Sequence, residues 1–138
     1  MVALVAWFDR EAPGPTQVET AADLDAVLDV LAATRRPNLV ELTVAGDPGR
    51  AVLNVGLDGA RGRGVLYCSG ATDPSVDAYY SRGAKSDDAE TIYYYMGSDT
   101  EFPEDAELPI SEVRKAAHQF LSTGGERPDG IDWQADDF

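Results

Sequence analysis

The feature that most constrains the fold is a run of five short strand-like segments in the middle of the chain. They are rich in branched and aromatic residues and are separated by turns rich in glycine, proline and aspartate. The segments are residues 39–44, 51–57, 65–68, 78–81 and 90–96. Links this short leave no room for the crossover helix that parallel neighbours require, so they predict an antiparallel sheet.

Two amphipathic helices are predicted, one on each side of this run. Residues 20–33 repeat leucine and valine at helical spacing, after a Thr20 that forms a capping box with Asp23. Residues 111–123 carry a second apolar face, and Gly124 can end this helix in the left-handed backbone conformation of a C-cap.

Further strands are expected near the two ends of the chain. Residues 2–8 are almost wholly apolar and predict a strand buried on both faces, followed by a loop over 9–16. Residues 131–133 predict an edge strand. The sequence therefore predicts one α+β domain over residues 1–138, with a mainly antiparallel sheet of about six to seven strands and two helices packed on one face.

Net charge limits the class of partner. The chain has 25 acidic and 11 basic residues, for a formal charge of −14 and a pI near 4.2. Such a surface repels nucleic acid and anionic membranes and attracts basic proteins, although acidity also serves solubility alone. A lone Cys68 excludes an internal disulfide, and no apolar run reaches the length of a membrane span, so we expect a cytoplasmic protein.

The strongest candidate site is an acidic stretch that we predict to be a loop between the strand at 90–96 and the second helix. It contains five carboxylates and no base: Asp99, Glu101, Glu104, Asp105 and Glu107. These carboxylates suit a basic partner, a divalent cation, or a hydrolase that uses paired acids. The plain alternative is a solvated loop beside a helix N-terminus, which accounts well for Glu107.

Aromatic residues next to this stretch are candidate anchors. Tyr94 faces opposite to Tyr93 and Tyr95 on the strand, and tyrosine is common both in packed strands and at interface hot spots. The proposed partner-binding set is Tyr94, Asp99, Glu101, Phe102, Glu104 and Asp105.

Other reactive side chains favour structural roles. His118 is the only histidine, and one His with one Cys is too little for a triad or a zinc site. Cys68 ends an apolar strand and is expected in the core. The glycine-rich residues 59–64 join two strands and read as a hairpin tip with solvated Arg61 and Arg63, rather than a phosphate loop. We therefore expect no catalytic, cofactor-binding or metal-binding residues.

An ordered set of short motifs covers about the last 75 residues. They are Arg63-Gly64-Val65-Leu66-Tyr67, Ser81-Arg82-Gly83, Tyr93-Tyr94-Tyr95-Met96-Gly97, Glu101-Phe102-Pro103, and Thr123-Gly124-Gly125-Glu126-Arg127-Pro128 before Trp133. This set resembles the immunity proteins of bacterial polymorphic toxin systems, in the family usually found beside deaminase toxins. The resemblance implies a non-enzymatic α+β antitoxin that neutralises a toxin inside the producing cell, with no catalytic residues.

The resemblance agrees with the charge. A toxin that acts on nucleic acid presents a basic substrate groove, and an acidic protein can occupy that groove as a phosphate mimic. Two alternatives remain: a small acidic hydrolase, and an interaction module for another basic partner.

Overall fold

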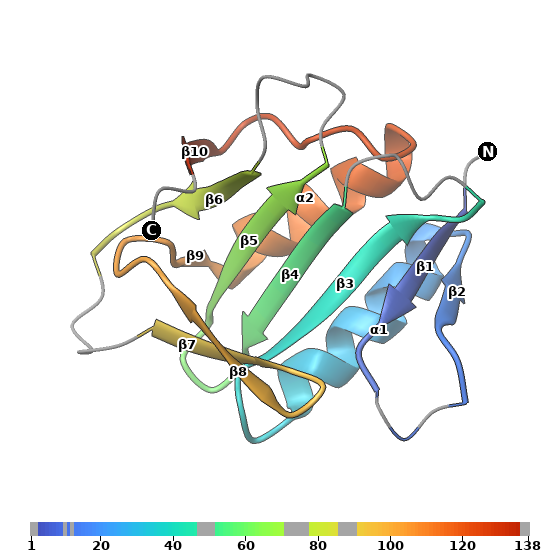
Figure 1. Ribbon diagram of the computed structural model, residues 1–138, viewed down its shortest axis with the longest axis horizontal. Helices are drawn as coiled ribbons and strands as arrows, with labels where there is room; N and C mark the ends of the chain where they lie inside the picture. The colour runs from blue at the N-terminus through green and yellow to red at the C-terminus, as the bar shows by residue number, and fades with distance from the viewer. Residues whose placement is uncertain are drawn as a thin grey trace.

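The computed structural model describes residues 3–9, 11, 13–46, 52–70, 78–85 and 91–135. Two helices, α1 (Ala21–Ala33) and α2 (Ile110–Ser122), lie together behind one large sheet (Figure 1). Within the described ranges the sheet has ten strands: β1 (Leu4–Trp7), β2 (Thr16–Val18), β3 (Asn38–Val44), β4 (Val52–Asp58), β5 (Arg63–Ser69), β6 (Ala78–Arg82), β7 (Thr91–Tyr95), β8 (Ser98–Phe102), β9 (Leu108–Pro109) and β10 (Asp132–Ala135).

The main sheet runs in the order β10-β6-β5-β4-β3-β1-β2, and each neighbouring pair is antiparallel. This confirms the predicted α+β class and the position of both helices on one face. The predicted strand number was too low, because β2, β8 and β9 lie in segments where no strand was expected. The only parallel pairing among the described strands is a single register pair between Asn38 of β3 and Tyr94 of β7.

The helix ends follow the sequence signals. The backbone N–H of Asp23 donates to Thr20 Oγ1 at 3.1 Å, and the N–H of Thr20 donates back to Asp23 Oδ2 at 3.2 Å, so the capping box is confirmed. At the end of α2, Gly124 has a φ of 74° and the N–H of Gly125 donates to the carbonyl of Phe120. This pattern is a Schellman cap, which needs glycine because a side chain disfavours that backbone conformation.

The main core lies between the helices and the sheet. Alternate residues of β1, β3, β4 and β5 point to the helices and are buried with the leucine face of α1 and with Phe120 of α2. The other side of β1 is not covered: Val5 is half-buried and Trp7 is 38% exposed. The prediction that this strand is buried on both faces was therefore wrong, because the helices cover only one side.

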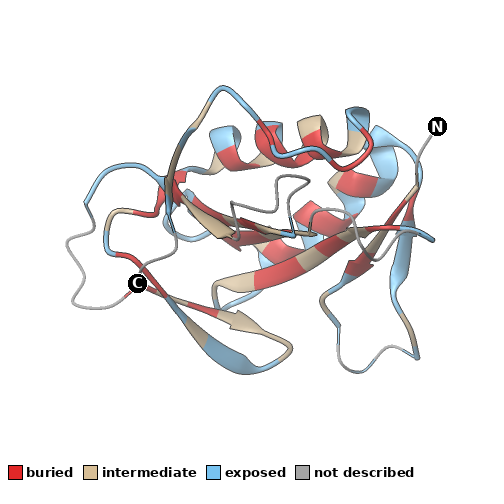
Figure 2. Ribbon diagram, turned by 45° about the horizontal axis from the view of Figure 1, so that its top comes forward, coloured by how far each residue is buried: buried red, intermediate tan, exposed pale blue. Residues whose placement is uncertain are grey.

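A second, smaller core lies on the opposite face. The β7–β8 hairpin crosses one end of the sheet there (Figures 1 and 2), and Tyr93 and Phe102 pack on Leu39 and Val65. The Tyr93 ring lies directly over Gly56, where an added Cβ would come within 2.7 Å of Tyr93 Cδ2. A glycine in the middle of β4 thus makes the space that the hairpin occupies.

The two helices are joined by ionic contacts. Arg114 Nη2 of α2 lies 3.1 Å from Asp25 Oδ1 and 2.9 Å from Asp29 Oδ1 of α1. His118 Nε2 lies 2.7 Å from the same Asp25 oxygen. Hydrogen bonds from His118 and Arg114 hold the pKa of the Asp25 carboxyl below its usual value. The lone histidine therefore has a structural place, as the sequence predicted.

Candidate partner-binding site

The first half of the acidic stretch is a strand and not the predicted loop. Met96 and Gly97 both have positive φ, 50° and 89°, and Tyr95 pairs directly with Ser98. Two residues of positive φ between paired strands form the tight turn that matches strand twist. The chain therefore reverses at Gly97 and continues as β8, which a pattern of mostly polar residues did not indicate.

This hairpin places three of the proposed residues on one surface. Cross-strand partners share a face, and the register pairs Tyr94 with Asp99 and Ile92 with Glu101. Their faces point away from the sheet, because Tyr93 and Phe102 point toward it. We call the outward residues Ile92, Tyr94, Asp99 and Glu101 the acidic hairpin face.

The two carboxylates of this face are available. Asp99 and Glu101 are exposed, and neither makes an ion pair with another described residue. Tyr94 is half-buried, and the guanidinium carbon of Arg36 lies 4.2 Å from its ring centroid. Because the Arg36 guanidinium already stacks on Tyr94, the negative charge of this face comes from Asp99 and Glu101 on β8.

Phe102 does not belong to the surface. Its side chain is 3% exposed and contacts the rings of Tyr80 and Tyr93 edge-on, at centroid distances of 5.4 and 5.7 Å. The position of Phe102 on β8 turns it inward, opposite to Glu101. Its role in this structure is to anchor the hairpin to the sheet, and the expectation of a partner-contacting side chain is corrected accordingly.

Glu104 and Asp105 are exposed or half-exposed but already have partners. Glu104 Oε1 lies 3.4 Å from Lys85 Nζ, and Asp105 Oδ2 lies 3.8 Å from Arg82 Nε. The Gln134 side chain donates to Asp105 Oδ1 at 2.9 Å. These contacts fix the segment after β8 against β6 and β10.

Ser81 of β6 and Gly83, just after this strand, hold the same segment, a structural role that their motif did not indicate. Ser81 is buried, accepts from the N–H of Leu66 at 3.0 Å and donates to the carbonyl of Ala106 at 2.7 Å. The N–H of Gly83 donates to the carbonyl of Asp105, and an added Cβ at Gly83 would meet the Glu107 carbonyl oxygen at 2.1 Å. The motif Ser81-Arg82-Gly83 therefore has a structural explanation.

Glu107 is part of the interior. It is 1% exposed and receives hydrogen bonds from Arg61 Nη1 and Nη2 at 3.1 and 2.9 Å, and from the Tyr93 hydroxyl at 2.7 Å. Burial and the bond to Glu107 raise the pKa of Tyr93. The interpretation of Glu107 as a solvated residue beside a helix was wrong. Arg61 is partly solvated, as expected, with a side chain 41% exposed, but its guanidinium also pairs with this buried carboxylate.

The five carboxylates thus divide into three kinds. Glu107 is a buried structural charge, Glu104 and Asp105 tie a segment to the sheet, and only Asp99 and Glu101 point outward from a projecting element without a described partner. Two like charges on one strand face repel each other and attract cations, so a basic partner relieves the repulsion.

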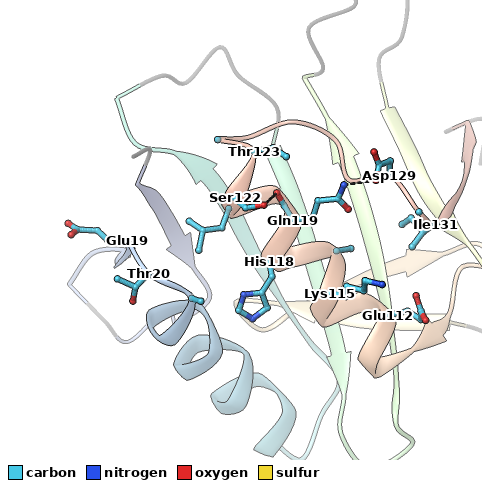
Figure 3. Close-up of a pocket in the computed structure, with 15 residues that line it drawn as sticks. Glu19, Thr20, Glu112, Lys115, His118, Gln119, Ser122, Thr123, Asp129 and Ile131 are labelled. Atoms are coloured by element: carbon cyan, nitrogen blue, oxygen red, sulfur yellow. Dashed lines mark hydrogen bonds between the residues drawn. The ribbon is translucent and has the colours of Figure 1, made fainter.

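A groove of about 1040 Å³ runs along the outer side of α2 (Figure 3). Its carboxylates come from separate elements: Glu19 lies to one side of α2, and Glu112 and Asp129 lie to the other (Figure 3). Its histidine, His118, is engaged by Asp25.

The remaining candidates are structural. Cys68 is buried in the main core, and its burial raises the thiol pKa to about 11, which disfavours the reactive thiolate. Residues 59–62 form the β4–β5 turn, and Gly59 approaches the carbonyl of Ala32 too closely for any side chain. Across the described residues, no group of three or more His, Cys, Asp or Glu side chains is placed to hold a metal ion. Neither described helix has the length and apolar character needed to cross a bilayer.

The chain matches a known protein family, and this match identifies the class of protein to which the surface belongs. The sequence model of immunity protein Imm1 matches residues 12–135, which is most of the chain. The chain belongs to the Imm1 immunity protein family. The match includes both helices, β2 to β10 and the whole acidic hairpin, so the Imm1 assignment covers the candidate site. No curated protein matches the chain.

Proposed function

We propose that this protein is an antitoxin, which binds a toxin made by its own cell and blocks it without carrying out a reaction. Membership of the Imm1 immunity protein family supports this role. We propose further that the toxin is a basic, nucleic-acid-targeting enzyme of the deaminase type, and that the two proteins meet in the cytoplasm.

The observation that supports the proposed surface is the pair of exposed carboxylates on the acidic hairpin face. A nucleic-acid enzyme carries lysine and arginine around its substrate groove. Asp99 and Glu101 lie on one face of β8, on a protein with a formal net charge of −14. Together these charges can steer such a groove toward the hairpin. Glu104 and Asp105 extend the acidic edge next to it. Phe102 anchors the hairpin that carries this surface to the sheet.

The test is co-expression with the toxin encoded beside this gene, scored by survival, followed by binding kinetics with an inactivated form of that toxin. The double charge reversal Asp99→Lys/Glu101→Lys should lower the association rate by about tenfold or more at low salt and flatten its salt dependence. Both residues are exposed, so stability should change little.

Glu126→Lys combined with Asp132→Lys is the matched control. Both residues are exposed and lie in the segment after α2 or on β10, away from the projecting hairpin (Figure 1), and the change in net charge is the same. Equal losses in the two double variants would assign the steering to net charge alone. Undiminished association in the hairpin variant would remove the hairpin from the interface.

A further inference from the structure

The face of the sheet opposite the helices is only partly covered. The β7–β8 hairpin packs over the end that carries Leu39, Gly56 and Val65. Residues one cross-strand row further along this face are half-buried or exposed and do not pack against the helices. Tyr67 and Tyr80 at one end of that row pack against the hairpin core, whereas Trp7 at the other end is exposed. The part of this sheet face beyond the hairpin, the open face, is distinct from the acidic hairpin face and carries different side chains.

One continuous row crosses the open face. The register places Trp7 opposite Glu41, Glu41 opposite Asn54, Asn54 opposite Tyr67, and Tyr67 opposite Tyr80. Their neighbours Ala6, Leu42, Leu53, Leu66 and Cys68 point into the helix-side core, so the members of the row point the other way. The four spacings of about 4.8 Å between the five strands make the row roughly 19 Å long. We call these five residues the aromatic row.

The chemistry of the aromatic row is that of an interface. It has one tryptophan, two tyrosines, one amide and one carboxylate, and it has no basic residue. Trp7 is 38% exposed, one of two large hydrophobic side chains exposed to this degree among the described residues. Tyrosine and tryptophan bury large area at low entropic cost and are enriched at binding hot spots.

The composition of the aromatic row favours contact with a cation. Glu41 is the only charge in it, and the register places it between Trp7 on the neighbouring strand and Asn54 on the other. Aromatic faces attract cations, and a guanidinium also pairs with a carboxylate in two parallel hydrogen bonds. The Tyr95 hydroxyl of the hairpin hydrogen bonds to Glu41, so the row and the hairpin adjoin.

We propose that the aromatic row is a second contact surface for the cognate toxin, and that it receives an arginine or lysine side chain of the toxin at Glu41, beside Trp7. This inference rests on the proposed antitoxin function. The acidic hairpin face would then steer the toxin, while the aromatic row would hold it. Desolvated contacts of this kind slow dissociation, whereas exposed charges act mainly on association.

The experiment measures association and dissociation rates of the wild-type protein and its variants with the inactivated toxin encoded beside this gene. Trp7→Ala and Glu41→Gln should each raise the dissociation rate by about tenfold or more, with little change in the association rate. Val30→Ala is the matched control, since Val30 is 52% exposed on α1, on the helix side of the sheet. Replacing one arginine or lysine of the toxin with alanine should abolish the effect of Glu41→Gln.

Asn54→Arg is a second variant that keeps the test decisive if Trp7→Ala reduces stability. Asn54 is half-buried, so a long arginine side chain at this position can reach solvent. Its positive charge should repel the incoming cation of the toxin. Unchanged dissociation rates in Glu41→Gln and Asn54→Arg, with the hairpin reversal still slowing association, would overturn this inference and leave the antitoxin function intact. Failure of the wild-type protein to bind the toxin would overturn both.

Discussion

At the scale of single residues, Glu107 carries the most consequential charge. It is buried, and its carboxylate is held by both terminal nitrogens of Arg61 and by the Tyr93 hydroxyl. Arg61→Met removes the compensating charge and leaves the carboxylate in the interior, so we expect the free energy of unfolding to fall by about 3 kcal/mol. The value lies at the low end for buried pairs because the Arg61 side chain is 41% exposed.

Urea unfolding of the Arg61→Met variant beside Arg63→Met measures this cost. Arg63 is an exposed arginine two residues along the same hairpin and forms no ion pair with another described residue, so its replacement should change stability by less than about 0.5 kcal/mol. Similar losses in the two variants would mean that the Arg61–Glu107 contact contributes nothing specific.

Residue identity predicted some of these roles and not others. The burial of Cys68 followed from its place on an apolar strand, and the structural role of His118 followed from the lack of partners for chemistry. The Arg61–Glu107 pair joins residues 46 apart in sequence, and no local pattern indicates that contact. A glutamate in an acidic stretch looks solvated until the fold supplies the arginine.

At the scale of elements, the β7–β8 hairpin depends on a glycine in another strand. Gly56 leaves the space for Tyr93, and an added Cβ there would lie 2.7 to 2.8 Å from side-chain atoms of Tyr93, Val65 and Leu39. Gly56→Ala should therefore lower the free energy of unfolding by about 1–3 kcal/mol, the usual cost of overpacking. Thermal unfolding measures it.

Gly14→Ala is the control for this change, because an added Cβ at Gly14 meets no atom within 4 Å and its φ is not positive. That variant should be neutral or slightly stabilising, since alanine restricts the unfolded chain. A Gly56→Ala variant as stable as wild type would mean that Tyr93 can move off the sheet at no cost.

Elements with a strong local signal were predictable, and elements made by pairing were not. Helix α1 has a capping box and a leucine face, and its N-cap is the predicted Thr20. Strands β2, β8 and β9 are three, five and two residues long, and they exist because a neighbouring strand offers its backbone. Propensity alone does not mark such strands. Because β8 was missed, Phe102 was placed on the surface and not in the core.

At the scale of the whole molecule, charge is the dominant property. A formal charge of −14 on 138 residues favours association with a basic partner but opposes compaction of the free protein through self-repulsion. Several exposed ion pairs act in the other direction, including those of Arg114 with α1 and of Lys85 with Glu104, and each is worth only about 0–1 kcal/mol.

The balance between these terms predicts the response to salt. Raising the ionic strength from about 10 mM to 150 mM shortens the screening length from about 30 to 8 Å, which removes long-range repulsion between carboxylates more than it weakens contacts at 3–4 Å. The melting temperature of the free protein should therefore rise with sodium chloride over this range, while the toxin association rate falls. Calorimetry and stopped-flow binding on the same samples check both trends. A melting temperature that falls with salt would show that the ion pairs outweigh the repulsion, and that the negative charge is less costly to this fold than its size implies.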